Sequence, residues 1–173
     1  NEIILSKQSH NPSSVLEKLR EKIIKALQQK GIRGEHKDGI DIAFCILHTR
    51  TMQLQYSGAM NPCWIIRPSI VPDFVELEPN LMPVAIHHNM ASFSMQEIQL
   101  QKGDQVYLFT DGFADQNGGE KKKKIQSSRL KEILIENKHL TMEEQKNKLE
   151  NYFDAWKGAN PQIDDVTILG IKI

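Results

Sequence analysis

Apolar and polar positions follow two different periods along this chain, and the period changes near residue 39. Before that point, apolar residues recur every three or four positions from Val15 to Leu27, which is the spacing of an amphipathic helix. Asn11 and Pro12 stand where a cap and a first helical turn belong, and we expect Gly31 to end the helix as its C′ residue, a position that glycine commonly fills in the left-handed conformation. The pattern predicts a helix that starts within residues 11–14 and ends before Gly31. Residues 2–5 resemble the last turn of an earlier helix.

After residue 39 the apolar residues alternate or form short continuous runs rich in β-branched and aromatic side chains, which is typical of strands. Thr49-Arg50 forms a tight connection between the first two runs, so we expect those two strands to form an antiparallel hairpin. The predicted strands cover residues 40–48, 52–57, 64–67, 74–77, 92–100 and 105–110.

Two helices and one strand follow. Ser127 or Ser128 can cap the first helix, and the Thr141-x-x-Glu144 spacing is that of a capping box for the second. Residues 166–173 are apolar on both alternations apart from Lys172, which is typical of a central strand covered on both faces. The predicted order of elements is a helix, many strands, two helices and a last strand. This order predicts an α+β fold in which helices pack on antiparallel sheet.

Composition narrows the class of protein. The 173 residues carry 22 basic and 22 acidic side chains, so charge gives no case for nucleic acid or an acidic membrane as the main partner. No run approaches the roughly 18 apolar residues of a membrane span, and no signal peptide opens the chain. We expect one cytoplasmic domain that needs no disulfide, with Cys45 and Cys63 as buried free thiols.

Candidate chemistry lies at two strand ends. Asp111-Gly112 directly follows the apolar strand 105–110, and Asp164-Asp165 directly precedes the last strand. Carboxylates without a paired His or Cys favour Mg²⁺ or Mn²⁺ over zinc. Asp-Gly is also a common turn dipeptide, and Asp before a strand is ordinary loop chemistry, so a purely structural role stays open at this point.

Five segments in order resemble motifs of the metal-dependent protein phosphatases of the 2C type, and specifically of the bacterial SpoIIE-like serine phosphatases. Asp111 and Gly112 belong to the first of the late motifs, and Asp164 and Asp165 belong to the second. Residues 56–62 (YSGAMNP) resemble the family's aGxxNP turn, and residues 81–86 (LMPVAI) resemble its mPiGi stretch. The motif-bearing segments are 56–62, 81–86, 108–112, 115–119 (DQNGG) and 164–167.

The resemblance implies hydrolysis of phosphoserine or phosphothreonine on a regulatory protein. Two Mn²⁺ or Mg²⁺ ions would be held by aspartates at the edge of an α-β-β-α sandwich, and a water between the metals would attack phosphorus. Carried over, Asp111 and Asp164 are metal ligands that act through that water. Gly112 and Asp165 belong to the same metal site, and which of Asp164 and Asp165 binds directly stays open.

The sequence departs from the family in one respect that matters. No Asp-x-x-Gly-His-Gly motif, which supplies the carboxylate that bridges both metals, occurs in these residues. We therefore expect residues 1–173 to form a single, partial SpoIIE-like domain that lacks its first strands. Such a fragment would have little activity alone, would bind metal weakly or not at all, and could dimerise or aggregate through exposed sheet edges. Ala59, where relatives carry His or Asp, removes support for a third metal.

Other residues admit weaker interpretations. Lys121 and Lys122 begin a run of four lysines that could steer a phosphorylated substrate, although a solvated loop is the commoner role. His87 and His88 would point to opposite faces if they lay on a strand, so they could not readily share an ion. The resemblance also implies two partners, a phosphorylated anti-sigma-factor antagonist as substrate and an upstream sensory or repeat domain. The alternative function is a non-catalytic regulatory or protein-binding module on the same fold.

Overall fold

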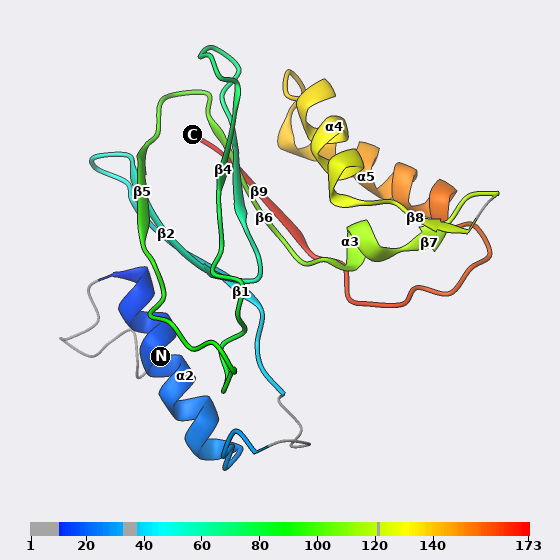
Figure 1. The fold of residues 1–173 in the computed structure, drawn as a ribbon. Helices are drawn as coiled ribbons and strands as arrows, with labels where there is room; N and C mark the ends of the chain where they lie inside the picture. The colour runs from blue at the N-terminus through cyan, green and yellow to red at the C-terminus, as the bar shows by residue number, and fades with distance from the viewer. Residues whose placement is uncertain (1–10, 33–37, 121) are drawn as a thin grey trace. The chain divides into compact units, whose positions relative to one another are not determined.

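A computed structural model of the protein describes residues 11–32, 38–120 and 122–173 (Figure 1). The chain divides into two compact units, each with its own sheet. The first comprises Asn1–Cys63 and Glu76–Gln101, and the second comprises Trp64–Val75 and Lys102–Ile173. The predicted residues 2–5 lie outside the described residues. No helix within the described ranges is both long and apolar enough to cross a lipid bilayer.

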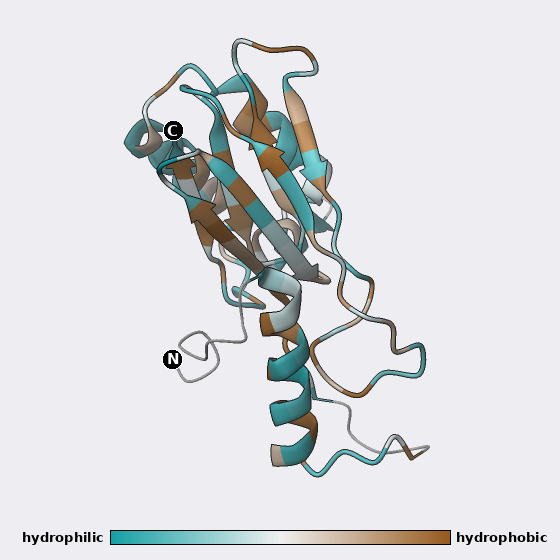
Figure 2. Ribbon diagram, turned by 90° about the vertical axis from the view of Figure 1, so that its left-hand side faces the viewer, coloured by the Kyte–Doolittle hydropathy of each residue, from teal (hydrophilic) through white to brown (hydrophobic). Residues whose placement is uncertain are grey.

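The first unit opens with helix α2 (Pro12–Ala26). The Asn11 side chain accepts a hydrogen bond from the Ser14 amide at 2.9 Å, as the predicted cap requires. Leu16 is fully buried in a core cluster that also contains Val84 and Phe93. Figure 2 shows hydrophobic and hydrophilic residues sharing the length of this helix, as its amphipathic pattern predicts.

The end of α2 differs from the prediction. The helix stops at Ala26, because Gln28 adopts a φ of 51° and takes the left-handed position that we had assigned to Gly31. Leu27 is consequently 53% exposed and does not belong to the buried face.

The sheet of the first unit has the order β1-β2-β5. Strands β1 (Ile42–His48) and β2 (Gln53–Ala59) pair antiparallel, which confirms the predicted hairpin. Strand β5 (Gln96–Gln99) pairs antiparallel with β2 but is much shorter than the predicted 92–100. The Ser94 amide instead donates to the Asn80 side chain at 2.9 Å, so this backbone leaves the ladder.

The sheet of the second unit has the order β4-β3-β6-β9. Its strands are β3 (Cys63–Ile66), β4 (Phe74–Leu77), β6 (Gln105–Phe109) and β9 (Ile168–Lys172). The prediction that the last strand is central was wrong for the described residues, because β9 is the end strand of the sheet. Its outward-facing Leu169 and Ile171 are 51% and 41% exposed.

Helices α4 (Ser127–Glu136) and α5 (Met142–Lys157) pack on this sheet and lie side by side in Figure 1. One core cluster joins Leu130 and Leu134 of α4 to Phe153 of α5 and to the sheet residues Trp64 and Phe109. The Thr141 side chain accepts from the Glu144 amide, and the Glu144 carboxylate accepts from the Thr141 amide, so the predicted capping box is confirmed. The α+β class with antiparallel sheets is likewise confirmed.

Three short elements were not predicted. Helix α3 (Gly112–Asp115) follows β6, and strands β7 (Asn117–Gly118) and β8 (Lys123–Lys124) form a small hairpin. The hairpin is fastened to α5, because the Gly119 amide donates to the Trp156 carbonyl at 2.9 Å. A Cβ on Gly118 would collide with that same carbonyl, which explains the first glycine of the 115–119 motif.

The two cysteines are free, as predicted. Cys63 is buried and Cys45 is half-buried. The hydrogen bond between their side chains, together with burial, raises the pKa of the Cys63 thiol well above its ordinary value. This thiol is therefore a poor nucleophile.

Candidate metal site at the end of strand β6

Asp111 leaves the sheet where β6 ends. Residues 105–109 are almost entirely buried, and the chain then turns into the single helical turn of α3. Asp111 occupies the cap position of that turn, but its side chain makes no capping hydrogen bond. Asp111 is exposed, while the neighbouring Gly112 and Phe113 are buried. The backbone is thus fixed by the core while the carboxylate faces solvent.

Thr110 ties this turn to the segment before β9. Its amide donates to the Thr167 carbonyl at 3.0 Å, and its hydroxyl accepts from the Thr167 amide at 3.0 Å. The same hydroxyl donates to the Asp165 carbonyl at 2.9 Å. One threonine therefore extends the β6–β9 ladder and holds the backbone that carries the second predicted pair of carboxylates.

Gly112 lets the two segments touch. A Cβ at this position would collide with the Asp165 carbonyl oxygen and would lie 3.4 Å from the Asp164 carbonyl carbon. Real Cβ atoms do not approach backbone so closely, so any side chain here would push the segments apart. The structure thus brings the predicted pair 111–112 against the predicted pair 164–165, although more than 50 residues separate them in sequence.

The two carboxylates of the second pair are exposed. One oxygen of the Asp164 side chain accepts from the Asp165 amide at 2.7 Å, and the Asp164 carbonyl accepts from the Gln162 side chain at 2.8 Å. Exposed carboxylate oxygens are the donor type that Mg²⁺ and Mn²⁺ prefer, so the chemistry of the set fits such a metal. Within the described residues, however, no three His, Cys, Asp or Glu side chains are grouped as metal ligands.

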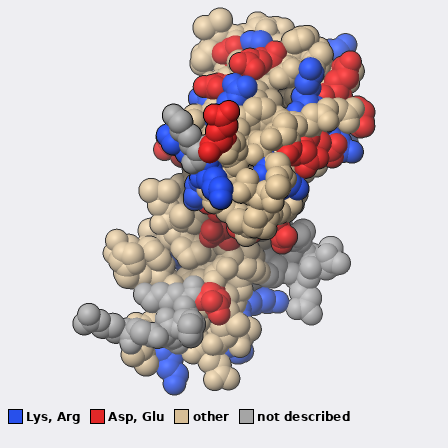
Figure 3. Space-filling view, turned by 90° about the vertical axis from the view of Figure 1, so that its right-hand side faces the viewer, with Lys and Arg blue, Asp and Glu red and all other residues tan. Residues whose placement is uncertain are grey.

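The lysine run lies on the β7–β8 hairpin. Lys121 lies outside the described residues, and Lys122 is exposed. Lys124 pairs with Asp115 at 2.8 Å, with both side chains about half exposed, so this contact is screened and weak. In Figure 3 acidic and basic side chains are interspersed on the face shown. A steering role for the lysines stays a prediction.

His87 and His88 differ from the expected geometry. They lie in a loop and not on a strand, and their rings are neighbours with centroids 4.2 Å apart. The premise that they point to opposite faces was therefore wrong. A nitrogen of His87 lies 3.4 Å from the Asn89 amide, and no third ligand is grouped with the pair among the described residues.

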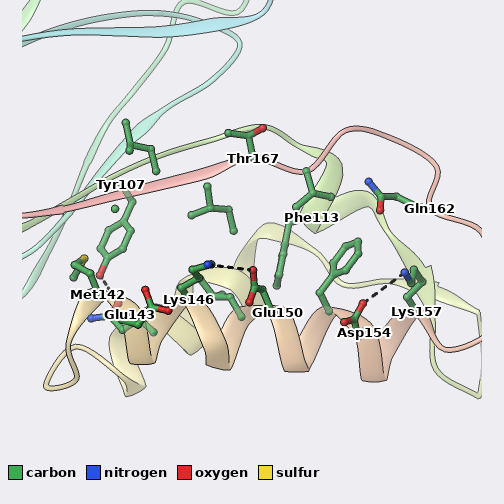
Figure 4. Close-up of a pocket in the computed structure, with 17 residues that line it drawn as sticks. Tyr107, Phe113, Met142, Glu143, Lys146, Glu150, Asp154, Lys157, Gln162 and Thr167 are labelled. Carbon is green, nitrogen blue, oxygen red and sulfur yellow. Dashed lines mark hydrogen bonds and ion pairs between the residues drawn. The ribbon is translucent and has the colours of Figure 1, made fainter.

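Sequence reasoning missed a groove of about 680 Å³ between α5 and β9. Phe113, Leu149, Phe153 and Ile168 contribute its apolar lining, and charged residues of α5 form a rim (Figure 4). No local pattern in the sequence marks it, because it arises where a helix and a strand from different segments leave space between them.

Tyr107 anchors α5 at the end of this groove. Its hydroxyl lies 2.7 Å from the side-chain oxygen of Gln105 and 2.6 Å from that of Gln145, and all three residues are buried. Burial raises the pKa of Tyr107 to about 12, whereas the hydrogen bond to Gln145 opposes the shift. This polar cluster fixes the register of α5 on β6, and it was not predicted.

Comparisons with known proteins identify the fold. The SpoIIE family (Stage II sporulation protein E) matches residues 3–173. The SiaA-PP2C domain of Pseudomonas aeruginosa is 23% identical with a TM-score of 0.84, and the match covers 99% of this chain and 65% of that one. A structure of the PP2C phosphatase domain and a regulatory fragment of SpoIIE from Bacillus subtilis is 15% identical with a TM-score of 0.72, over 99% and 46% of the two chains.

RsbX in complex with magnesium is a further structural neighbour, with 16% identity, a TM-score of 0.65, and coverage of 98% of this chain and 68% of that one. No curated protein matches the sequence. At these identities the solved structures show a shared fold alone, and the chain spans just under two thirds of the SiaA domain. The family match extends over nearly the whole sequence. The chain belongs to the SpoIIE family, whose fold is that of the PP2C-type phosphatases.

Proposed function

We propose that this chain is part of a metal-dependent protein phosphatase that removes phosphate from phosphoserine or phosphothreonine. The observation that carries the proposal is the close approach of Gly112 to the Asp164–Asp165 backbone, which brings the segment that holds Asp111 against the segment that holds the second pair of carboxylates. Membership of the SpoIIE family and the PP2C-type fold support the reaction class.

Asp111 and Asp164 would hold the metal, with Asp165 orienting a ligand or a water. When bound, Mn²⁺ or Mg²⁺ makes a water acidic enough to serve as a nucleophile at neutral pH and neutralises charge on the phosphoryl group. The chain's own contribution is rigidity. Thr110 and Gly112 fix the backbone on both sides of the site, so exposed carboxylates are held in place without being buried.

The site in these 173 residues is incomplete in this proposal. The sequence has no Asp-x-x-Gly-His-Gly motif, and the described residues contain no group of three metal-ligating side chains. Two carboxylates close together repel each other and need a cation or a proton between them. We therefore expect weak metal affinity and little activity from this chain by itself.

The substrate class follows from the resemblance to SpoIIE-like phosphatases. A phosphorylated regulatory protein, such as an anti-sigma-factor antagonist, is the proposed substrate, and an upstream sensory or repeat domain is the proposed source of control. No contact in the described residues selects one phosphoprotein over another.

The test is Mn²⁺-dependent hydrolysis of a phosphoserine peptide by this chain and by a longer domain that includes the Asp-x-x-Gly-His-Gly motif. We expect activity from the longer domain only, and at least a 100-fold loss in its Asp111→Asn variant. Asp154→Asn is the matched control, because it removes the same charge from an exposed site on α5.

A longer domain that binds no Mn²⁺ and hydrolyses nothing would instead favour the alternative function, a non-catalytic module that binds proteins. This alternative is favoured by one observation, the lack of a group of three metal-ligating side chains among the described residues. Asp111 would then be a turn residue without a role in chemistry.

A further inference from the structure

The fold of the first unit brings its two cysteines together from different strands. Cys45 lies in β1 and is directly opposite Tyr56 of β2, and Cys63 is the first residue of β3. Side chains that are directly opposite across an antiparallel pair share one face of the sheet. On that face the Tyr56 hydroxyl donates to the Asn61 carbonyl at 2.6 Å, two residues before Cys63. The turn that leads to Cys63 is thus held over the face that carries Cys45.

The two thiols are hydrogen-bonded to each other. This hydrogen bond, ahead of burial, raises the pKa of the Cys63 thiol. Because the bond keeps the proton on Cys63, this thiol is the donor and the Cys45 sulfur is the acceptor. Burial is the main cause of the raised pKa of Tyr56, and the neighbouring Cys63 and Cys45 thiols add to it. The three side chains therefore share one space, and nothing stands between the two sulfur atoms.

Access to solvent separates the two thiols. Cys63 is fully buried, whereas Cys45 is half-buried. Oxidation of cysteine follows exposure of the sulfur, so a small oxidant reaches Cys45 first. Cys63 is then already in place to react with the product. A partly exposed thiol with a second thiol poised beside it is the arrangement of a reversible oxidation site.

We propose that Cys45 and Cys63 form a site of reversible oxidation, at which hydrogen peroxide converts the two thiols into a disulfide. The Cys45 sulfur attacks one peroxide oxygen, the O–O bond breaks, and Cys45 becomes a sulfenic acid with release of one water. The Cys63 sulfur then attacks the Cys45 sulfur. The S–O bond breaks, and the oxygen leaves with the Cys63 proton as a second water. Two thiols and one peroxide yield one disulfide and two waters, and two electrons pass from sulfur to oxygen.

The geometry sets the rate and the consequence of this reaction. Hydrogen-bonded sulfurs need only a short movement to reach the disulfide length of about 2.05 Å. The raised pKa of Cys63 makes the second step slow at neutral pH, and the step becomes faster as the pH rises and more thiolate forms. The product ties β1 to the start of β3 and closes a loop around the 56–62 turn, which constrains the unfolded chain. The inference needs no metal and no phosphate hydrolysis, so it stands apart from the proposed function.

The test treats the folded 173-residue chain with hydrogen peroxide, blocks the remaining thiols with iodoacetamide, and maps the peptides by mass spectrometry without reduction. We expect one cross-linked peptide pair, Cys45 with Cys63, in a monomeric chain. It should form several times faster at about pH 8.5 than at about pH 7. The urea midpoint of the oxidised chain should rise by about 1 M, and dithiothreitol should restore both thiols and the original midpoint.

Two matched variants separate the steps. In Cys63→Ala the oxidation of Cys45 should stop at the sulfenic acid, which dimedone traps. In Cys45→Ala the buried Cys63 should remain a thiol under the same treatment. If either variant fails to fold by circular dichroism, the peptide map of the unchanged chain still decides. Three results would overturn the proposal: both thiols intact at a peroxide exposure that fully oxidises glutathione, oxidation of Cys45 to a sulfinic acid without a cross-link, or a cross-link between two chains only.

Discussion

Two motif-bearing turns of this protein each contain a glycine that allows a close packing contact, but the two turns differ in whether their polar side chains stay exposed. In the first unit, a Cβ on Gly58 would collide with the Tyr56 hydroxyl and lie 2.6 Å from the Asn61 carbonyl oxygen. In the second unit, a Cβ on Gly112 would collide with the Asp165 carbonyl. Both glycines permit a close approach that no other residue allows.

What surrounds each glycine separates structure from chemistry. The Tyr56 hydroxyl donates to the Asn61 carbonyl at 2.6 Å, and Tyr56 is fully buried. These two polar groups of the first turn are therefore hydrogen-bonded to each other. The second turn leaves the carboxylates of Asp111, Asp164 and Asp165 exposed. A tightly packed turn becomes a candidate site only where its ligand-type side chains remain available to solvent.

The largest effect is expected from Gly112→Ala. The methyl group must displace the Asp165 backbone, so we expect unfolding free energy to fall by about 3 kcal/mol, the upper end for overpacking. In the longer domain that includes the Asp-x-x-Gly-His-Gly motif, the same change should lower Mn²⁺ affinity at least tenfold as the two carboxylate pairs separate. Urea denaturation and Mn²⁺ titration of the folded variant measure the two effects.

Gly58→Ala is the matched change in the other turn. It should destabilise the chain by a similar amount, about 3 kcal/mol, because its methyl group meets the Tyr56 hydroxyl. Mn²⁺ affinity should stay within twofold of the unchanged protein. A large loss of Mn²⁺ binding would break the distinction between the two turns.

Alkaline pH should lower the free energy of unfolding, because the buried tyrosines then lose their protons. Burial raises the pKa of Tyr107 to about 12, and the pKa of Tyr56 is also raised by burial. The folded state keeps these protons longer than the unfolded state, so their stabilising effect is complete below pH 10 and is lost as the pH rises toward the folded pKa. We expect Tyr107 alone to contribute a fall on the order of 2 kcal/mol between pH 10 and 12. In the Tyr107→Phe variant, the plot of unfolding free energy against pH should be flatter between pH 10 and 12. An unchanged slope would show that Tyr107 does not cause the loss of stability.

Tyr56→Phe tests the structural turn directly. It removes a hydroxyl that donates to a backbone carbonyl, and we expect a cost of about 1.5 kcal/mol in thermal or urea unfolding. Metal binding should not change. Stability equal to that of the parent chain would mean that the Tyr56–Asn61 hydrogen bond does not hold this turn.

The smallest effect is expected at Thr110. Thr110→Val keeps the shape but removes the hydroxyl that contacts both Asp165 and Thr167, at a cost of about 1 kcal/mol. Mn²⁺ affinity should fall severalfold, and Thr110→Ser should restore it. Loss of stability without loss of affinity would show that the hydroxyl supports the sheet alone.

The sequence predicted the helices and strands better than their ends and the edges of the sheets. Local signals such as the Asn11 cap and the Thr141–Glu144 capping box act within a few residues, and both are confirmed. The contact between the segment of Gly112 and that of Asp164 and Asp165 was anticipated from family motifs, since no local rule joins residues so far apart. Gln28 ended α2 early, because a polar residue can adopt the left-handed conformation that we had reserved for glycine.

The last strand shows why the rest escaped prediction. Apolar residues on both faces of a strand indicate that these side chains avoid water, but they do not indicate which element covers each face. Leu169 and Ile171 satisfy the pattern of a central strand, yet β9 is the end of the described sheet. The groove beside it depends on the distance between α5 and β9, which is a property of tertiary packing and has no counterpart in residue spacing.

The most direct test of the central claim is Mn²⁺ binding followed by electron paramagnetic resonance, in a longer domain that includes the Asp-x-x-Gly-His-Gly motif. The account predicts saturable binding that is lost in Asp111→Asn and in Asp164→Asn and retained in Asp154→Asn. Binding that survives both substitutions, with all variants folded, would contradict the assignment of this corner as the metal site.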